Sequence, residues 1–72
     1  MTDVKIDTEY ITLGQMLKLA DVIQSGGMIK WFLSEHEVFV NNEPEDRRGR
    51  KLRDGDVISI SGVGRFQIVS TM

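Results

Sequence analysis

The absence of cysteine is the feature that most constrains a chain of only 72 residues. A chain this short buries about 60% of the surface that its unfolded form exposes, so its stability margin is small. Without cysteine, a disulfide framework and a thiolate zinc site are both excluded, and one histidine is too few for a multi-histidine metal site. Hydrophobic residues make up 40% of the chain, which is too many for a disordered protein. We therefore expect residues 1–72 to form a single domain with one small hydrophobic core and no metal or other cofactor.

The spacing of the hydrophobic residues predicts a strand and then a helix in the first part of the chain. Val4 and Ile6 alternate with polar neighbours, as in a short strand. Thr12 and Gln15 have the three-residue spacing of a capping box, which marks the start of a helix. The next hydrophobic residues follow the pattern of an amphipathic helix of about ten residues that ends at the Ser-Gly-Gly of residues 25–27. They are Leu13, Met16, Leu17 and Ala20.

A second helix is predicted after this break, with Ser25 as its N-cap. Its hydrophobic face consists of Ile29, Phe32 and Leu33. Ser25, Gly26 and Gly27 form either a tight turn between the helices or a phosphate site made by free backbone N–H groups, and the two interpretations are compatible. Trp31 lies off the hydrophobic face, beside Lys30. We expect Trp31 to cover the edge of a thin core, and the alternative is stacking on a base or ribose.

The remaining sequence predicts short strands separated by turns. Val38, Phe39 and Val40 form one strand, and hydrophobic residues near positions 57–60 and 65–70 form two more. Asn41 and Asn42 tolerate the left-handed conformation and mark a turn, and Leu52 is expected to point inward. A helix pair followed by strands predicts an α+β fold. In it, two short packed helices lie against a small antiparallel sheet of three to five strands.

Residues 47–53, called here the basic segment, carry five of the nine Lys and Arg residues of a chain whose formal net charge is −2. These five are Arg47, Arg48, Arg50, Lys51 and Arg53. Four are arginines, whose planar guanidinium binds phosphate through two parallel hydrogen bonds, and Gly49 lets the backbone approach a ligand closely. If the segment is a regular strand, Arg47, Lys51 and Arg53 share one face. Arg48 and Arg50 then share the other face with Leu52.

No group of residues has the pattern of an active site. His36, the only histidine, is interpreted as a polar residue at a helix end. Glu43, Glu45 and Asp46 lie in a predicted turn, and a chain this short has no deep cleft that excludes water. We expect a protein that is not an enzyme and takes no small-molecule substrate. The sequence also lacks a signal peptide and a hydrophobic run of about 20 residues, so we expect no membrane association and a cytoplasmic location.

The second helix, followed by "VFVNN" and "KLRDGDVISI", resembles the RNA-binding domain family named after ribosomal protein S-four, also called the alpha-L motif. In that family a helix pair precedes a V-x-V-N-G strand and turn, and then a V-x-x-G-D-x-I strand. The matching residues here are Val38, Val40, Asn41, Asn42, Leu52, Gly55, Asp56 and Ile58. The resemblance covers residues 11–60. Within it, "ITLGQMLKLA" and "RRGRKL" are most similar to the small stand-alone bacterial members of the YaaA and YbcJ type.

The resemblance implies a non-catalytic domain that binds structured RNA, typically ribosomal or transfer RNA, through the helix pair and the adjoining loops. Lys30 matches the basic residue that the family has on its second helix, and Ser25 matches the first residue of its S-R-S turn. Gly26 stands where the family often has arginine, and Thr12 and Gln15 stand where its first helix often begins with basic residues. The positive face of the helix pair is thereby reduced. We therefore expect the basic segment to supply more of the RNA contacts.

The sequence thus predicts an RNA interface that combines the helix pair, the Asn-Asn turn and the basic segment. Its residues are Ser25, Gly26, Gly27, Lys30, Trp31, Asn41, Asn42, Arg47, Arg48, Arg50, Lys51 and Arg53. Five phosphate contacts would give a slope of log K against log salt concentration of roughly −4 to −5. The expected partner is ribosomal RNA or a ribosomal subunit, with transfer RNA as a second choice, bound by a monomer. The alternative is a small interaction module that docks on an acidic protein.

Overall fold

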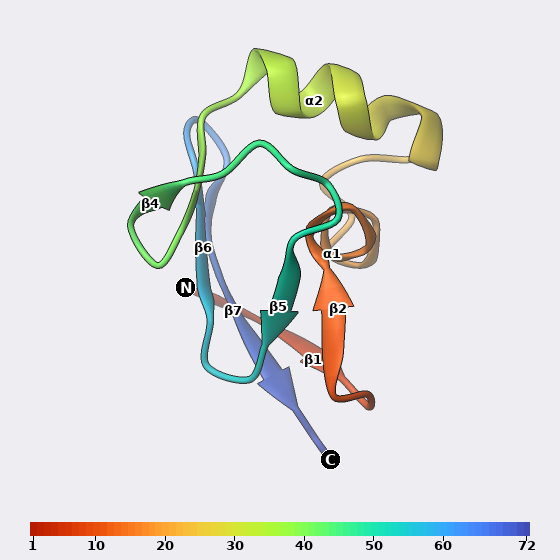
Figure 1. The fold of residues 1–72 in the computed structure, drawn as a ribbon, viewed down its shortest axis with the longest axis vertical. Helices are drawn as coiled ribbons and strands as arrows, with labels where there is room; N and C mark the ends of the chain where they lie inside the picture. The colour runs from red at the N-terminus through yellow and green to blue at the C-terminus, as the bar shows by residue number, and fades with distance from the viewer.

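The computed structural model describes residues 1–72, and its elements follow the predicted order of a strand, two helices and further strands, with one additional short strand before the first helix (Figure 1). The helices are α1 (Leu13–Leu19) and α2 (Ile29–Glu35), and a 3-10 turn (Gly26–Met28) leads into α2. The strands are β1 (Thr2–Ile6), β2 (Tyr10–Thr12), β3 (Val38–Val40), β4 (Glu43–Pro44), β5 (Lys51–Arg53), β6 (Val57–Ile60) and β7 (Gly64–Ser70).

The strands form one mixed sheet of five strands and one separate pair. The large sheet has the order β1-β7-β6-β3-β4, and β2 pairs antiparallel with β5. This arrangement confirms the α+β class. It differs from the expected single antiparallel sheet in two respects. Strands β2 and β5 form a separate pair, and β1 runs parallel to β7, where the buried residues Val4 and Ile68 lie opposite each other. Hydrophobic alternation predicts that a segment is a strand, but it does not specify the partner or the direction of pairing.

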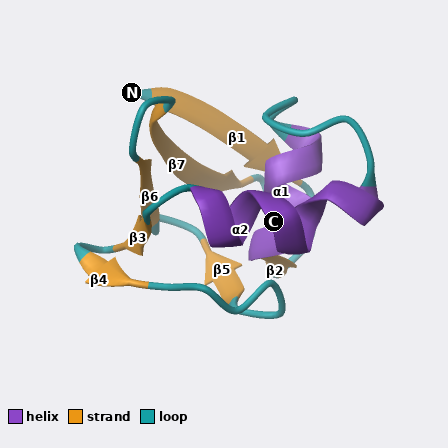
Figure 2. Ribbon diagram, turned by 90° about the horizontal axis from the view of Figure 1, so that it is seen from above, coloured by secondary structure: helices purple, strands orange, loops and turns teal.

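The hydrophobic core lies between the five-stranded sheet and the helices, which are on the same side of that sheet (Figure 2). Leu13, Met16 and Leu17 of α1 are completely buried. Leu52 of β5 is also completely buried, which confirms the prediction that it points inward. The two-stranded sheet therefore belongs to the same core as the large one. Neither helix has the length and hydrophobicity that crossing a bilayer requires.

The first helix begins as predicted and ends earlier. Thr12 and Gln15 form both hydrogen bonds of the capping box, at 3.3 and 3.1 Å. The helix stops before the Ser-Gly-Gly, because Asp21 adopts a left-handed conformation with φ of 62°. The N–H groups of Asp21 and Val22 donate to the carbonyls of Lys18 and Leu17, as in a Schellman motif. Aspartate tolerates this conformation better than most residues, so a glycine is not needed to end the helix.

In the second helix, the structure corrects the expectation for Trp31. Phe32 is buried and stacks on the ring of His36, which caps the C-terminal end of α2. Trp31 instead has 53% of its surface exposed, so it does not cover the core. The neighbouring position on a helix points about 100° away, and here that direction faces solvent. Ser25 is not the N-cap of α2 that the sequence predicts, because the 3-10 turn intervenes and places Met28 at that position. Ser25 precedes the 3-10 turn, and its side chain makes no capping hydrogen bond.

Candidate nucleic-acid interface

The basic segment is not a regular strand, so the two faces predicted for it from strand alternation are not formed. Only Lys51–Arg53 is a strand, and residues 47–50 form a loop that leads into it. The carbonyl of Arg50 accepts a hydrogen bond of 2.8 Å from the N–H of Leu13, and that of Arg48 accepts one of 2.9 Å from Gly14. The first N–H groups of a helix have no partner within it, so the loop supplies partners for the start of α1. In return, α1 fixes the backbone of the loop.

Glu45, which precedes the loop, connects it to β3 and to two of its arginines. Its backbone N–H donates to the carbonyl of Val38, and its carboxylate accepts bonds from Nε, Nη2 and the backbone N–H of Arg47 at 2.9, 3.1 and 3.0 Å. Nη1 of Arg50 donates to the same carboxylate at 2.8 Å. The Glu45 side chain is only 4% exposed, whereas that of Arg47 is 73% exposed. A buried carboxylate thus pairs with two of the five cations of the basic segment.

These hydrogen bonds keep the Glu45 carboxylate ionised. The side-chain hydrogen bond from Arg47 is the main reason that the pKa of Glu45 falls from 4.5 to about 2, although burial acts in the opposite direction. The same contact raises the pKa of Arg47. Glu45, Arg47 and Arg50 therefore carry one net positive charge between them. The hydrogen bonds among these three residues stabilise the conformation of the loop. The remaining cations of the segment, Arg48, Lys51 and Arg53, have no buried carboxylate beside them.

A groove lies between α2 and the loop, and we call it the α2 groove. Lys30, Leu33 and Ser34 line it from α2, and Asp46 and Arg48 line it from the loop, around a volume of about 330 Å³. The structure thus brings Lys30 and Arg48, which are distant in the sequence, to the same groove. Two cations on flanking elements suit a phosphate group, while Asp46 reduces the positive field on one wall. The Ser34 hydroxyl already donates to the carbonyl of Trp31 at 2.7 Å.

Gly14 allows the three elements around this groove to approach one another closely. It is buried in α1, and a Cβ atom placed there would lie 3.0 Å from Cδ1 of Ile29 and 3.5 Å from Cβ of Arg48. Ile29 begins α2, and Arg48 belongs to the loop. A larger residue at position 14 would therefore press on the Ile29 side chain, which would have to move to accommodate it.

Lys51 and Arg53 present a second group of cations on the two-stranded sheet. Both are exposed on β5, where Lys51 Nζ lies 4.9 Å and Arg53 Cζ lies 5.4 Å from the ring centre of Tyr10 on β2. Arg53 also makes a solvent-exposed contact of 3.5 Å with Glu9. Tyr10 is absent from the predicted interface, because a three-residue strand is too short to show alternation and its pairing with β5 is not visible in the sequence.

The other predicted residues lie outside these two groups. Ser25, Gly26 and Gly27 are exposed in the turn that leads into α2. Asn41 and Asn42 form the predicted left-handed turn, with φ of 52° and 71°. The Asn41 side chain donates to Asp56 at 3.1 Å and accepts from the N–H of Val57 at 2.9 Å. Asn41 therefore has a structural role that joins the β3–β4 turn to β6, and Asn42 is exposed.

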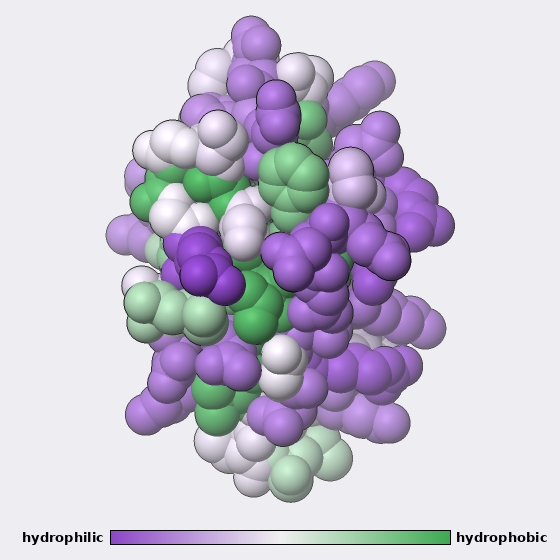
Figure 3. All heavy atoms as spheres, turned by 90° about the vertical axis from the view of Figure 1, so that its left-hand side faces the viewer, coloured by the Kyte–Doolittle hydropathy of each residue, from purple (hydrophilic) through white to green (hydrophobic).

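The surface around the loop is predominantly hydrophilic. Figure 3 shows the left-hand side of Figure 1, and its right-hand part, which corresponds to the front of Figure 1, is covered mainly by hydrophilic side chains. The loop between β4 and β5 lies at that front (Figures 1 and 2). No three His, Asp or Glu side chains are grouped in a way that could hold a metal ion.

Comparison with known proteins assigns the chain to a family. The S4 domain family model matches residues 4–69. The chain belongs to the S4 domain family. A curated relative, the "Probable ribosome maturation protein RlbA" of Bacillus subtilis (strain 168), is 73% identical over 67 residues, which cover 93% of this chain and 94% of the relative. The resemblance of residues 11–60 to the alpha-L motif is thus confirmed, and the S4 domain match also includes most of β1 and most of β7.

Proposed function

We propose that this S4 domain protein is a single-domain, non-catalytic module that binds structured RNA in the cytoplasm, with ribosomal RNA as the first candidate and transfer RNA as the second. Membership of the S4 domain family supports RNA as the partner. The name of the relative, which refers to ribosome maturation, supports an RNA of the ribosome or its precursors. No residue is assigned a catalytic role, because recognition needs only positive charge and a fixed shape.

The observation that carries this proposal is the shared position of Lys30 and Arg48 in the α2 groove. Arg48 is held there by the contacts of the loop with α1 and by the bonds of Glu45 to its neighbours. A loop that is already ordered loses less conformational entropy when it binds. In the proposed complex, Lys30 and Arg48 neutralise phosphates and release their counterions, and the rigid groove selects helical or junction RNA by shape.

The remaining cations have separate roles in this proposal. Lys51 and Arg53 extend the contact surface along β5, while Arg47 and Arg50 position the loop through Glu45. Ser25, Gly26, Gly27, Trp31 and Asn42 border the helix pair or the β3–β4 turn and are proposed as peripheral contacts. The direct phosphate contacts are therefore made mainly by Lys30, Arg48, Lys51 and Arg53.

Charge reversal in the α2 groove tests this proposal. We expect Lys30→Glu combined with Arg48→Glu to reduce the affinity for ribosomal RNA at low salt by about tenfold or more, because two phosphate contacts become repulsive. Arg65→Glu is the matched control, since Arg65 is exposed on β7 and does not line this groove. It should retain most of the affinity. Circular dichroism would verify that all variants remain folded.

The result also separates RNA from a protein partner. Equal binding by the wild type and the double variant would remove the α2 groove from the interface. If the wild type binds neither ribosomal nor transfer RNA at low salt, the proposed function is wrong. Salt-sensitive binding to an acidic protein, lost in the same double variant, would then support the alternative of a docking module.

A further inference from the structure

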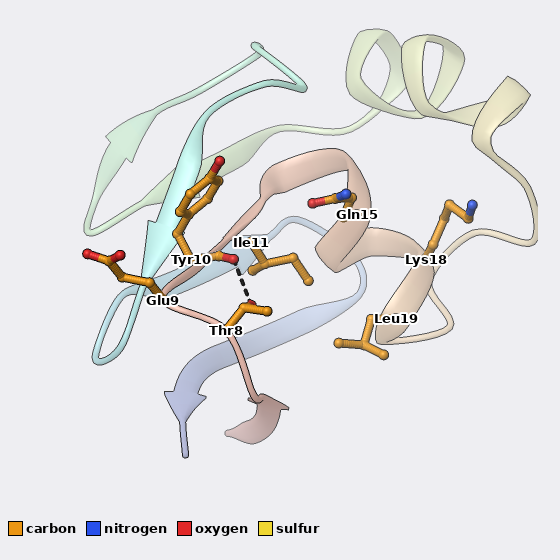
Figure 4. A pocket seen from close by; sticks show the side chains of 7 residues that line it. All are labelled: Thr8, Glu9, Tyr10, Ile11, Gln15, Lys18 and Leu19. Atoms are coloured by element: carbon orange, nitrogen blue, oxygen red, sulfur yellow. Dashed lines mark hydrogen bonds between the residues drawn. The ribbon is translucent and has the colours of Figure 1, made fainter. Parts of the chain in front are cut away.

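A second groove lies beside β2, and we call it the Tyr10 groove. It is open to solvent, has a volume of about 730 Å³, and is bordered by the β1–β2 turn, β2 and the outer face of α1 (Figure 4). This volume is within the range of about 300–1,000 Å³ that is typical of ligand sites. Figure 4 shows Tyr10 towards one end, Lys18 and Leu19 towards the other, and Ile11 and Gln15 between them.

The lining of this groove combines three kinds of group. Tyr10 and Leu19 are large hydrophobic side chains that are 40% and 56% exposed. Gln15 uses its side-chain oxygen to accept the N–H of Thr12, so its NH₂ group remains available as a donor. Lys18 adds a cation at the α1 end. An aromatic wall, an amide donor and a cation are the groups that recognise one unpaired nucleotide.

The charges around Tyr10 favour a polyanion as the occupant. Lys51 and Arg53 lie 4.9 and 5.4 Å from the centre of its ring, and Lys18 borders the same groove. Glu9 is the acidic residue in the lining, and its carboxylate already contacts Arg53 at 3.5 Å. Because both cations lie over the ring, a base that stacks on Tyr10 takes the place of a cation there, and its phosphates then lie within reach of both side chains. Such stacking tolerates any base, because every base has a π face.

Strand β5 connects the proposed interface to the neighbourhood of this groove. Lys51 directly follows the loop that carries Arg48, and β5 continues to Arg53 beside Tyr10. A strand that leaves a helical RNA bound at the α2 groove can follow this row of cations to Tyr10. We propose that the Tyr10 groove binds an unpaired nucleotide of single-stranded RNA next to a helix, by stacking on Tyr10 and by phosphate contacts to Lys51 and Arg53. This inference rests on the proposed RNA-binding function and adds a second, single-strand contact to it.

Two RNA probes test the inference. One is a short blunt RNA hairpin, and the other is the same hairpin with a single-stranded oligoadenylate tail. The wild type should bind the tailed hairpin more tightly. Tyr10→Leu, which keeps a hydrophobic side chain, should lower the affinity for the tailed hairpin by about 5- to 100-fold and leave the affinity for the blunt hairpin unchanged. Tyr10→Phe keeps the aromatic ring and should bind both probes as the wild type does.

A spectroscopic readout locates the contact without any mutation. The chain has one tyrosine and one tryptophan, so fluorotyrosine and fluorotryptophan each give a single fluorine NMR signal. The tailed hairpin should shift the Tyr10 signal more than the blunt hairpin does. An unshifted Tyr10 signal at saturation, or equal effects of Tyr10→Leu on both probes, would overturn the inference.

The possible failures are distinguishable. If the blunt hairpin binds and the Lys30 and Arg48 reversals weaken it, but the tail adds no affinity, only the single-strand contact is wrong. If neither probe binds the wild type at low salt, the single-strand contact and the proposed function are wrong together. Binding of an acidic protein that shifts the Tyr10 signal, in the absence of RNA binding, would assign the groove to a protein partner.

Discussion

The carboxylate of Glu45 accepts two parallel hydrogen bonds from the guanidinium of Arg47, at 2.9 and 3.1 Å. The Glu45 side chain is almost completely buried. Arg47 begins the turn at residues 47–50, which is closed by a hydrogen bond of 3.2 Å from the N–H of Arg50 to the carbonyl of Arg47. Arg50 adds a third side-chain bond from the other end of that turn. Glu45 therefore stabilises the conformation of the loop, although the proposed RNA binding by this loop depends on positive charge.

Replacing Glu45 should destabilise the protein. Glu45→Gln keeps the shape of the side chain but removes its charge, so the three charge-assisted bonds from Arg47 and Arg50 weaken or are lost. We expect the free energy of unfolding to fall by about 1–3 kcal/mol in urea titrations. Glu43→Gln on the exposed strand β4 is the matched control and should change it by less than about 0.5 kcal/mol. Similar values for the two variants would show that the Glu45 site contributes little.

The stability of the protein should depend on pH through Glu45. Its pKa is about 2 in the folded state against an ordinary value of 4.5, so the unfolded chain binds a proton first as the pH falls. The contribution of Glu45 is thus fully present above pH 4.5 and is lost as the pH falls from 4.5 to about 2. Unfolding titrations across this range should show a smaller decline for Glu45→Gln than for the wild type. Parallel declines would contradict the lowered pKa.

Enlarging Gly14 should affect both stability and binding. A Cβ atom added at Gly14 would lie only 3.0 Å from the Ile29 side chain, which leaves no room for a branched side chain between α1, α2 and the loop. We expect Gly14→Val to lower the free energy of unfolding by about 1–3 kcal/mol and to weaken RNA binding. Gly49→Val is the control, because a Cβ at Gly49 has no atom within 4 Å. A fully stable Gly14→Val variant would mean that α2 can move away from α1 with little loss of stability.

The salt dependence of RNA binding should be weaker than five free cations would produce. Glu45 already neutralises part of the charge of Arg47 and Arg50, which leaves Lys30, Arg48, Lys51 and Arg53 for phosphate contacts. Four contacts give a slope of log K against log salt concentration of about −3.6. Titrations at several salt concentrations would measure it. A slope steeper than about −4 would show that Arg47 and Arg50 also displace counterions.

Truncating Trp31 should have a small effect on stability. Replacing a core tryptophan by alanine lowers the free energy of unfolding by about 3–5 kcal/mol. Trp31 is 53% exposed and contacts the ring of His36 edge-on, so we expect Trp31→Ala to cost about 1 kcal/mol. Phe32→Ala, on the buried side of the same helix, provides the comparison and should cost about 3 kcal/mol or more. Equal losses of unfolding free energy in the two variants would show that Trp31 packs in the core.

Local patterns in the sequence predicted local structure well. The capping box at Thr12 and Gln15, the left-handed turn at Asn41 and Asn42 and the inward direction of Leu52 are all present in the structure. Each depends on interactions among residues a few positions apart or on a simple distinction between hydrophobic and polar side chains. The α1 end is an instructive exception, because Asp21 ended the helix before the more obvious glycines.

The sequence by itself determined the α+β class, the helix pair, the turns and the concentration of positive charge in residues 47–53. Only the tertiary structure decided which of those charges are free, because the burial of Glu45 beside Arg47 and Arg50 depends on how the loop folds against α1 and β3. It also decided that Lys30 and Arg48 line the same groove, that Lys51 and Arg53 lie over the ring of Tyr10, and that β1 pairs parallel to β7. Periodicity and turn chemistry act over a few neighbouring residues, whereas these contacts join segments whose distance is set by the whole fold.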